Sequence, residues 1–340
     1  MNNIEIRIDK RIELVSVLLL LTGYEDDYVL DECKHNKEYR QEIFDYFKNC
    51  KNKKAVVLLE KWLAKIKFGG TGVVGTVCPF ALLFDDNWNF HVECDEFYNK
   101  KHWLDLSKTI KTFVEESGFE KFYANHKTFY QSLIDNAKDT VQIEKTEKFL
   151  TKFYGEDFAN KPKHILNLTL IITNVGYGLT TYLNEDFCIF ALNSSAKRFY
   201  FIGAEEGGST AVHEFSHPII NPLVDKYCNY EKDFYSDIKD IMQQIGYPWD
   251  DPAAITIEHI ARSLQVLFLK TMFKNEPKFA LTKLDQVVNN AGFKYAPLFV
   301  TGLESFYKNK RKYKNFEEYL PILLNYVKNN KDLVDKIKPL

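Results

Sequence analysis

The segment from His213 to His217 constrains this chain more than any other, because it reads His-Glu-x-x-His. On a helix, residues four apart lie one turn apart on the same face, so the two imidazoles can bind one Zn²⁺. Glu214 is rotated away from that face and is suited to act on water rather than to bind the metal. The chain holds only 8 histidines among 340 residues. The motif therefore predicts a zinc site.

The residues around the motif predict where its helix begins and ends. The Gly-Gly-Ser-Thr run at 207–210 supplies two helix breakers and two hydroxyl residues, either of which can cap the new helix. Pro218 disfavours the α conformation at the preceding residue, and Pro222 is a second stop signal. We expect an active-site helix over 210–221, kinked near Pro218, and a strand over 199–202 before it.

A catalytic zinc ion usually keeps three protein ligands and one open position, so the sequence must supply a third ligand. The metzincin class is excluded, because Ile220 and Leu223 stand where it needs glycine and histidine. Further on, Asp251 as a cap and a proline at the first helical position predict a helix over 252–273. Glu258 lies on the one polar stripe of this apolar helix, and it is the preferred third ligand.

Two roles for Glu258 and its neighbour Arg262 stay open. Glu258 could simply pair with Arg262, one turn further on, or it could bind the metal with Arg262 behind it. Stabilising an oxyanion requires a further donor, and the candidates are Arg262, Tyr247 and Tyr295. His259 is the one residue that could close the site as a fourth ligand. The other third-ligand candidates are His259 and the acidic residues Asp225, Glu231, Asp233, Asp237 and Asp240.

The motif HEFSH followed by a glutamate on a later helix resembles the gluzincin class of zinc metallopeptidases. That resemblance implies an α+β, zincin-like fold with a small, mostly antiparallel or mixed sheet beside the active-site helix. Arg262 departs from the thermolysin pattern, which has aspartate there. HEFSHPIINP, IEHIAR and IDKRIELVSVLLLLTGYEDDY also resemble a bacterial family grouped as a domain of unknown function, over about residues 6–321. Pro218 is a variation on that pattern.

We therefore expect a zinc-dependent peptidase in which His213, His217 and Glu258 hold Zn²⁺ and Glu214 is the general base. The expected partner is a peptide or protein substrate, which could pair with the strand at 199–202. Two alternatives remain. One is a non-catalytic protein that binds metal or partners, and the other is a zinc hydrolase of a non-peptide amide or ester.

Charge and composition argue against several other functions. The net charge of −2 gives no broad basic field for nucleic acid or an anionic membrane. The basic run at 308–314 is interpreted as solvated surface. The glycine pattern at 70–75 matches G-x-G-x-x-G but lacks the βαβ context of a dinucleotide site, so no organic cofactor is expected.

The cysteines and the N-terminal apolar run favour a cytoplasmic protein. Six cysteines are scattered without a C-x-x-C pair, as in proteins that keep their thiols reduced. The run at 12–21 is interrupted by Glu13, lacks a cleavage site and is too short to span a membrane. We expect it to belong to the fold.

Periodicity predicts a mostly helical N-terminal region at 1–160 and a catalytic region at 161–340 with a sheet at 165–203. The catalytic region also holds the helices at 210–221 and 252–273 and further helices up to its end. The helices expected in the first region cover 38–47, 54–66, 102–116 and 125–154. The expected strands cover 166–174, 178–183, 187–192 and 199–202.

Overall fold

The computed structural model describes residues 4–24, 37–65, 73–91, 100–173, 176–192, 203–247 and 249–336. The fold is mostly helical α+β with a small mixed sheet of four strands. The chain forms two compact units, which we name the sheet unit (Glu5–Lys138 and Ile165–Ile202) and the helical unit (Met1–Ile4, Asp139–His164 and Gly203–Leu340). The predicted boundary near residue 160 stays a prediction.

The sheet unit combines the four strands with the helices of the N-terminal half. The sheet order is β1-β2-β4-β3, and β3 pairs antiparallel with β4 in a register that sets Gly176 opposite Phe190. The strands are β1 (Ile4–Arg7), β2 (His164–Thr173), β3 (Gly176–Thr180) and β4 (Asp186–Leu192). The helices are α1 (Lys10–Thr22), α2 (Lys37–Phe47), η1 (Lys48–Cys50), α3 (Lys54–Leu63), α4 (Val74–Ala81), α5 (Lys100–Ser117), α6 (Phe119–Asn125) and α7 (Lys127–Val141).

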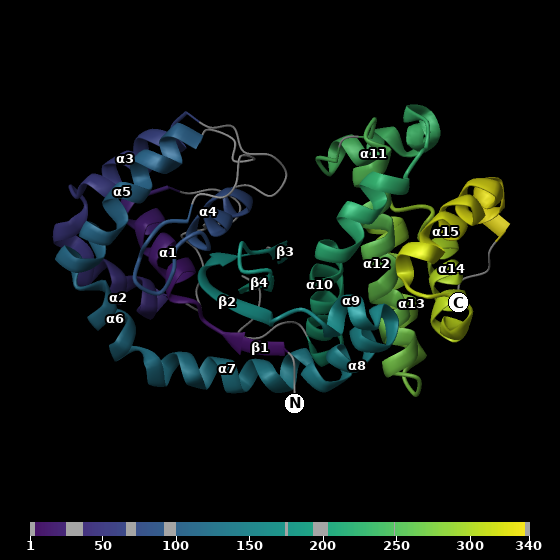
Figure 1. Cartoon of the computed structure of the whole chain (residues 1–340), viewed down its shortest axis with the longest axis horizontal. Helices are drawn as coiled ribbons and strands as arrows, with labels where there is room; N and C mark the ends of the chain where they lie inside the picture. Colours follow the sequence, from purple (N-terminus) through teal and green to yellow (C-terminus); the bar gives the residue numbers. More distant parts are fainter. Residues whose placement is uncertain are drawn as a thin grey trace. The chain divides into compact units, whose positions relative to one another are not determined.

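Helix α1 forms the centre of the sheet unit. The Asp9 carboxylate caps it by accepting a hydrogen bond from the Arg11 backbone N–H, and every residue from Arg11 to Leu21 is buried. It packs against α2, α3 and α4, as Figure 1 shows. The expectation that this apolar run belongs to the fold is confirmed. Among the described residues, no helix is long and apolar enough to cross a membrane.

The helical unit is built around two long helices that lie side by side (Figure 1). These are α10 (Gly203–Tyr227) and α12 (Pro252–Met272), and α14 (Ala296–Lys308) also packs against α12. The other α-helices are α8 (Ile143–Tyr154), α9 (Glu156–Ala159), α11 (Lys239–Gln244), α13 (Pro277–Asp285) and α15 (Phe316–Asn330). Short turns complete the unit: η2 (Lys232–Ile238), η3 (Gln286–Asn290), η4 (Lys310–Lys312) and η5 (Lys331–Lys336).

Helix α10 extends beyond both ends of the helix predicted over 210–221. It begins at Gly203, includes Gly207 and Gly208, and continues through Pro218 and Pro222 to Tyr227. Glycine in a helix interior costs about 1 kcal/mol in propensity, and proline costs more. Tertiary packing outweighs these costs here, because α10 is buried along much of its length against α12.

Other sequence predictions can be compared directly with the elements. The helix predicted over 125–154 is two helices, because Gln142 has a left-handed φ of 50° and separates α7 from α8. The sequence predicts strands near the positions of β2, β3 and β4, and the structure confirms all three. The predicted strand at 199–202 lies outside the described residues. Cys50, Cys78 and Cys188 are buried and Cys228 is partly buried, whereas Cys33 and Cys94 are not described.

Candidate metal site

The three predicted ligands meet where α10 packs along α12. His213 and His217 lie on α10, and Glu258 lies in the first half of α12. Gly208, one turn before His213, permits the close approach of these helices. A Cβ atom at Gly208 would lie 3.0 Å from two ring atoms of Phe268 and from the carbonyl oxygen of Val141. The motif and the third ligand are therefore brought together by helix packing.

The distances among the three side chains suit a small tetrahedral ion. The Nε2 atoms of His213 and His217 lie 3.1 Å apart. Nε2 of His213 lies 3.7 Å from Oε2 of Glu258, and Nε2 of His217 lies 3.7 Å from the other oxygen, Oε1. Zinc binds nitrogen and oxygen at about 2.0–2.2 Å, so ligand atoms at tetrahedral angles lie roughly 3.3 Å apart. The observed separations bracket that value, and the donor set of two imidazoles and one carboxylate is one that zinc prefers.

The partners of these atoms also fit a bound cation. Nδ1 of His217 lies 3.1 Å from Oδ1 of Asn221, a contact that holds the ring with Nε2 turned toward His213 and Glu258. Burial, with His217 and Arg262 nearby, holds the pKa of His213 well below its usual value, so this imidazole is neutral. Oε2 of Glu258 is buried and makes no hydrogen bond with any described residue. This oxygen lies 3.2 Å from Nε of Arg262, and a cation held by the three side chains would supply a second positive partner.

Arg262 forms an ion pair with the third ligand, Glu258. Its Nε lies 3.2 Å from Oε2 of Glu258, one turn earlier on α12. Its guanidinium also lies over the Phe293 ring, at 4.5 Å from the centroid. Arg262 thus limits where the carboxylate can turn, and the oxygen that it contacts also lies 3.7 Å from Nε2 of His213. The ion pair and the ligand position are compatible in one geometry.

Glu214 lies close to the two imidazoles without joining them. Its side chain is buried, and Oε1 lies 3.9 Å from Nε2 of His213. This distance exceeds the ligand spacing above, as expected for the residue that follows the first histidine on a helix. The carboxylate is placed to reach a small molecule bound beside the imidazoles.

The two candidate tyrosines differ in position. The hydroxyl of Tyr247, after α11, lies near the Glu258 carboxylate and the Arg262 guanidinium, and burial together with the Glu258 charge raises its pKa to about 12. Tyr247 therefore keeps its proton at neutral pH and can donate. The hydroxyl of Tyr295 instead donates to Asp237 at 2.5 Å. Of these two residues, Tyr247 is the one whose hydroxyl is influenced by the charge of the third ligand.

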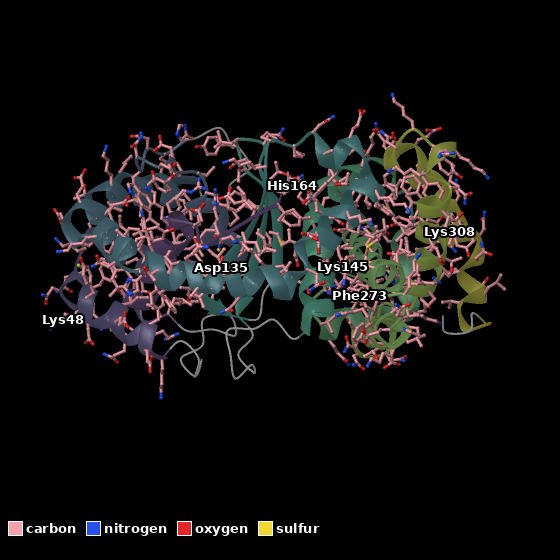
Figure 2. All side chains as sticks on the ribbon, turned by 90° about the horizontal axis from the view of Figure 1, so that it is seen from below. Lys48, Asp135, Lys145, His164, Phe273 and Lys308 are labelled. Atoms are coloured by element: carbon pink, nitrogen blue, oxygen red, sulfur yellow. The ribbon has the colours of Figure 1, made fainter. Side chains whose placement is uncertain are left out.

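The other histidines of this unit belong to its core. His259 is fully buried, its Nδ1 lies 2.9 Å from the Ile255 carbonyl oxygen, and its ring stacks on Tyr235. Burial lowers its pKa to about 3. His164, labelled in Figure 2, stacks on the Phe158 ring. Within the described part of the chain, His213, His217 and Glu258 form the one group of His, Cys, Asp and Glu residues arranged to hold a metal ion.

Residues 102–326, more than half of the chain, match a family described as a domain of unknown function, DUF4932. The chain belongs to this family. The DUF4932 match contains all three metal-site residues, Glu214 and Arg262. No curated protein and no solved structure matches the chain.

Sequence patterns alone do not identify Asn221 as a site residue of this DUF4932 protein. They predict a stop signal at Asn221 and Pro222, whereas α10 continues and places Asn221 one turn after His217. The spacing of four residues between them is the available signal, because a side chain at that distance on a helix can reach the second nitrogen of a ligating imidazole.

Proposed function

We propose that this protein is a zinc-dependent peptidase of the gluzincin type. His213, His217 and Glu258 would hold Zn²⁺, and Glu214 would be the general base. The observation that carries this proposal is the convergence of two imidazole Nε2 atoms and one carboxylate within 4.8 Å of one another, with the buried Glu214 carboxylate beside them. A closed structural site would need a fourth protein ligand, and within the described residues the group contains three.

When bound, zinc would lower the pKa of water to about 7 and polarise the scissile carbonyl group. Glu214 would accept the proton of the attacking water and deliver it to the leaving amine. Its carboxylate is buried and lies 3.9 Å from Nε2 of His213, close enough to reach a water molecule bound beside the imidazoles.

Tyr247 is the preferred donor to the developing oxyanion. It keeps its proton because its pKa is raised to about 12, and its hydroxyl already lies beside the Glu258 carboxylate. Arg262 would instead orient Glu258 through the 3.2 Å contact. Tyr295 is less suited, since its hydroxyl is bonded to Asp237.

The test combines metal analysis with cleavage of a peptide library. Glu214→Gln should retain zinc at the wild-type ratio and lose hydrolysis by at least about a hundredfold, because it removes the general base but no ligand. Glu258→Ala should lose zinc. Glu231→Gln, an exposed acid in the same unit, is the matched control and should behave as wild type.

Full peptidase activity in Glu214→Gln would contradict the mechanism, and unchanged zinc affinity in Glu258→Ala would move the third ligand elsewhere. Ester or non-peptide amide hydrolysis that depends on Glu214, without peptide cleavage, would support the alternative hydrolase. Zinc binding without any turnover would support a non-catalytic metal protein.

A further inference from the structure

A large basic cavity lies in the helical unit, apart from the metal site. Its volume is about 1390 Å³, and its walls come from α8, the end of α12, the start of α13, and the end of α14 with η4. Nine of the residues that line it are lysine or arginine, and one, Glu304, is acidic. The chain as a whole has a net charge of −2. The positive charge is therefore concentrated at this cavity and does not follow from the composition.

Glu304 does not neutralise this charge, because it is shared by two lysines. Lys270 lies 2.9 Å from one of its oxygens and Lys308 lies 2.7 Å from the other. These two pairs lower the pKa of Glu304 although its partial burial raises it, so the carboxylate stays charged. It holds two lysine side chains at the cavity wall. The other seven cationic residues of the lining have no acidic partner among the lining residues.

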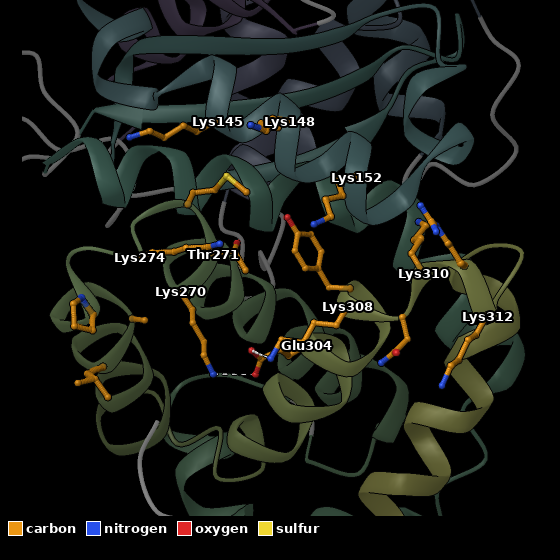
Figure 3. Close-up of a pocket in the computed structure, with 17 residues that line it drawn as sticks. Lys145, Lys148, Lys152, Lys270, Thr271, Lys274, Glu304, Lys308, Lys310 and Lys312 are labelled. Carbon is orange, nitrogen blue, oxygen red and sulfur yellow. Dashed lines mark hydrogen bonds and ion pairs between the residues drawn. The ribbon is translucent and has the colours of Figure 1, made fainter.

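Further lysines are held in place by aromatic rings and backbone. Nζ of Lys145 lies 4.2 Å from the centroid of the Phe273 ring, and both residues are labelled in Figure 2. Nζ of Lys152 lies 3.9 Å from the centroid of Tyr307, and Lys310 donates to the carbonyl oxygen of Phe153. Figure 3 shows the labelled lysines on three sides of the cavity. These contacts hold several ammonium groups around one space.

So many like charges around one space repel each other, and a multivalent anion in that space would relieve the repulsion. Eight of the nine cations are lysines, which bind phosphate as point charges, whereas arginine suits planar, bidentate recognition. The cavity is larger than the roughly 300–1000 Å³ of ordinary ligand pockets. Its concave form favours a compact ligand over a nucleic acid, because protein surfaces that bind nucleic acid are usually extended basic stripes.

We propose that this cavity binds a small molecule that carries several phosphate groups, such as an inorganic oligophosphate or a nucleoside polyphosphate. The basic run at 308–312 is then part of a binding site, not only solvated surface. The cavity and the metal site share α12, where Lys270 follows Glu258 by 12 residues, or about 18 Å of helix. None of the three metal-site residues lines the cavity. The proposal therefore stands independently of the proposed peptidase activity.

The test is calorimetric titration of chelator-treated full-length protein with inorganic triphosphate and with ATP at low ionic strength. Triphosphate should bind at one per chain. ATP should bind at the same ratio if the site also accommodates a nucleoside. The triple variant Lys148→Glu, Lys274→Glu and Lys312→Glu should weaken that binding by at least about tenfold. A second triple variant with glutamine at the same positions should weaken it less, and it covers the case in which charge reversal prevents folding.

The matched control reverses three exposed lysines of the same unit that do not line the cavity, Lys163, Lys232 and Lys328. It changes the net charge equally and should bind triphosphate within about twofold of wild type. Glu258→Ala should also bind normally, which separates this site from the metal site. The proposal is overturned if neither phosphate ligand binds saturably, or if the control loses as much affinity as the cavity variant. Tighter binding of single-stranded RNA, polyglutamate or anionic vesicles than of triphosphate would also overturn it.

Discussion

Glu13 is a carboxyl group that folding removes almost entirely from water. It lies in the first turn of the buried helix α1, and Tyr39 donates a 2.6 Å hydrogen bond to its Oε1. The Tyr39 hydroxyl also lies 2.6 Å from that of Tyr130. Burial raises the pKa of Glu13 to about 7, although the hydrogen bond from Tyr39 opposes the shift. The folded protein therefore holds a proton that the unfolded chain releases near pH 4.5.

This shift predicts a stability that falls as the pH rises. Because the pKa is higher in the folded state, the contribution of Glu13 is fully present below about pH 4.5 and is lost as the pH passes about 7. Urea unfolding at pH 5 and pH 8 should show that wild type loses roughly 2–3 kcal/mol more between these pH values than Glu13→Gln. Equal pH dependence in the two proteins would show that Glu13 does not titrate in this range.

At the residue scale, the sequence could predict the ligands but not their supporting residues. His213, Glu214 and His217 are recognisable because their spacing is local, and Glu258 because it is a carboxylate on an apolar helix with a clear start. Asn221 is not recognisable because it stands at the predicted end of the helix, next to Pro222, where it is interpreted as part of a stop signal. Tyr247 and Tyr295 could not be separated either, since only the packing of α11, η2 and α14 determines which hydroxyl reaches Glu258 and which reaches Asp237.

At the element scale, the packing of α10 against α12 depends on Gly208, because a side chain at this position would collide with its neighbours. The nearest neighbours of a Cβ at Gly208 include the carbonyl oxygen of Val141, and a backbone atom cannot rotate away. Gly208→Ala should destabilise the protein by about 1–3 kcal/mol, although alanine is the better helix former by about 1 kcal/mol. The measurement is urea unfolding.

The control for this prediction is Asn325→Ala on the exposed face of α15, which should change the free energy of unfolding by no more than about 0.5 kcal/mol. A Gly208→Ala protein as stable as wild type would mean that α10 and α12 can separate slightly at this point. Zinc affinity should then be measured, because His213 lies one turn further along.

Elements with local start signals were predictable from the sequence. Asp251 caps α12 by accepting from the N–H groups of Ala253 and Ala254, with proline at its first position, as expected. The separation of α7 from α8 was not predictable, because Gln142 adopts a left-handed φ although it is neither glycine nor asparagine. The burial of Val141 and Ile143 on either side shows that tertiary packing sets this break.

At the scale of the whole molecule, the two compact units are interleaved along the chain. The chain passes from one unit to the other four times, and only the helical unit contains the metal-site residues. Three of the four tryptophans, Trp62, Trp88 and Trp103, belong to the sheet unit, and Trp249 belongs to the helical unit. The response of each unit to metal can therefore be followed separately.

Removal of the proposed zinc ion should lower the unfolding temperature of the helical unit selectively. Zinc at a hundredfold excess over its Kd stabilises the folded state by about 2.7 kcal/mol, which corresponds to roughly 5–10 °C for a unit of this size. Calorimetry should show that shift on chelation. In Trp249→Phe, tryptophan fluorescence reports the sheet unit alone and its melting temperature should stay constant. One common shift in both measurements would show that the units unfold together.

The interleaving also determines which pieces of this protein can be studied alone. The family match begins at residue 102, after β1 and the helices from α1 to α4, although it includes β2 and most of α5. A fragment cut at 102 and 326 would keep the ligand-bearing helices but leave β2 without its neighbour β1 and α5 without α3. Exposed strand edges and apolar helix faces favour aggregation. The ends of the family match are therefore not suitable ends for an expressed fragment. A soluble fragment would have to retain the residues that precede the match.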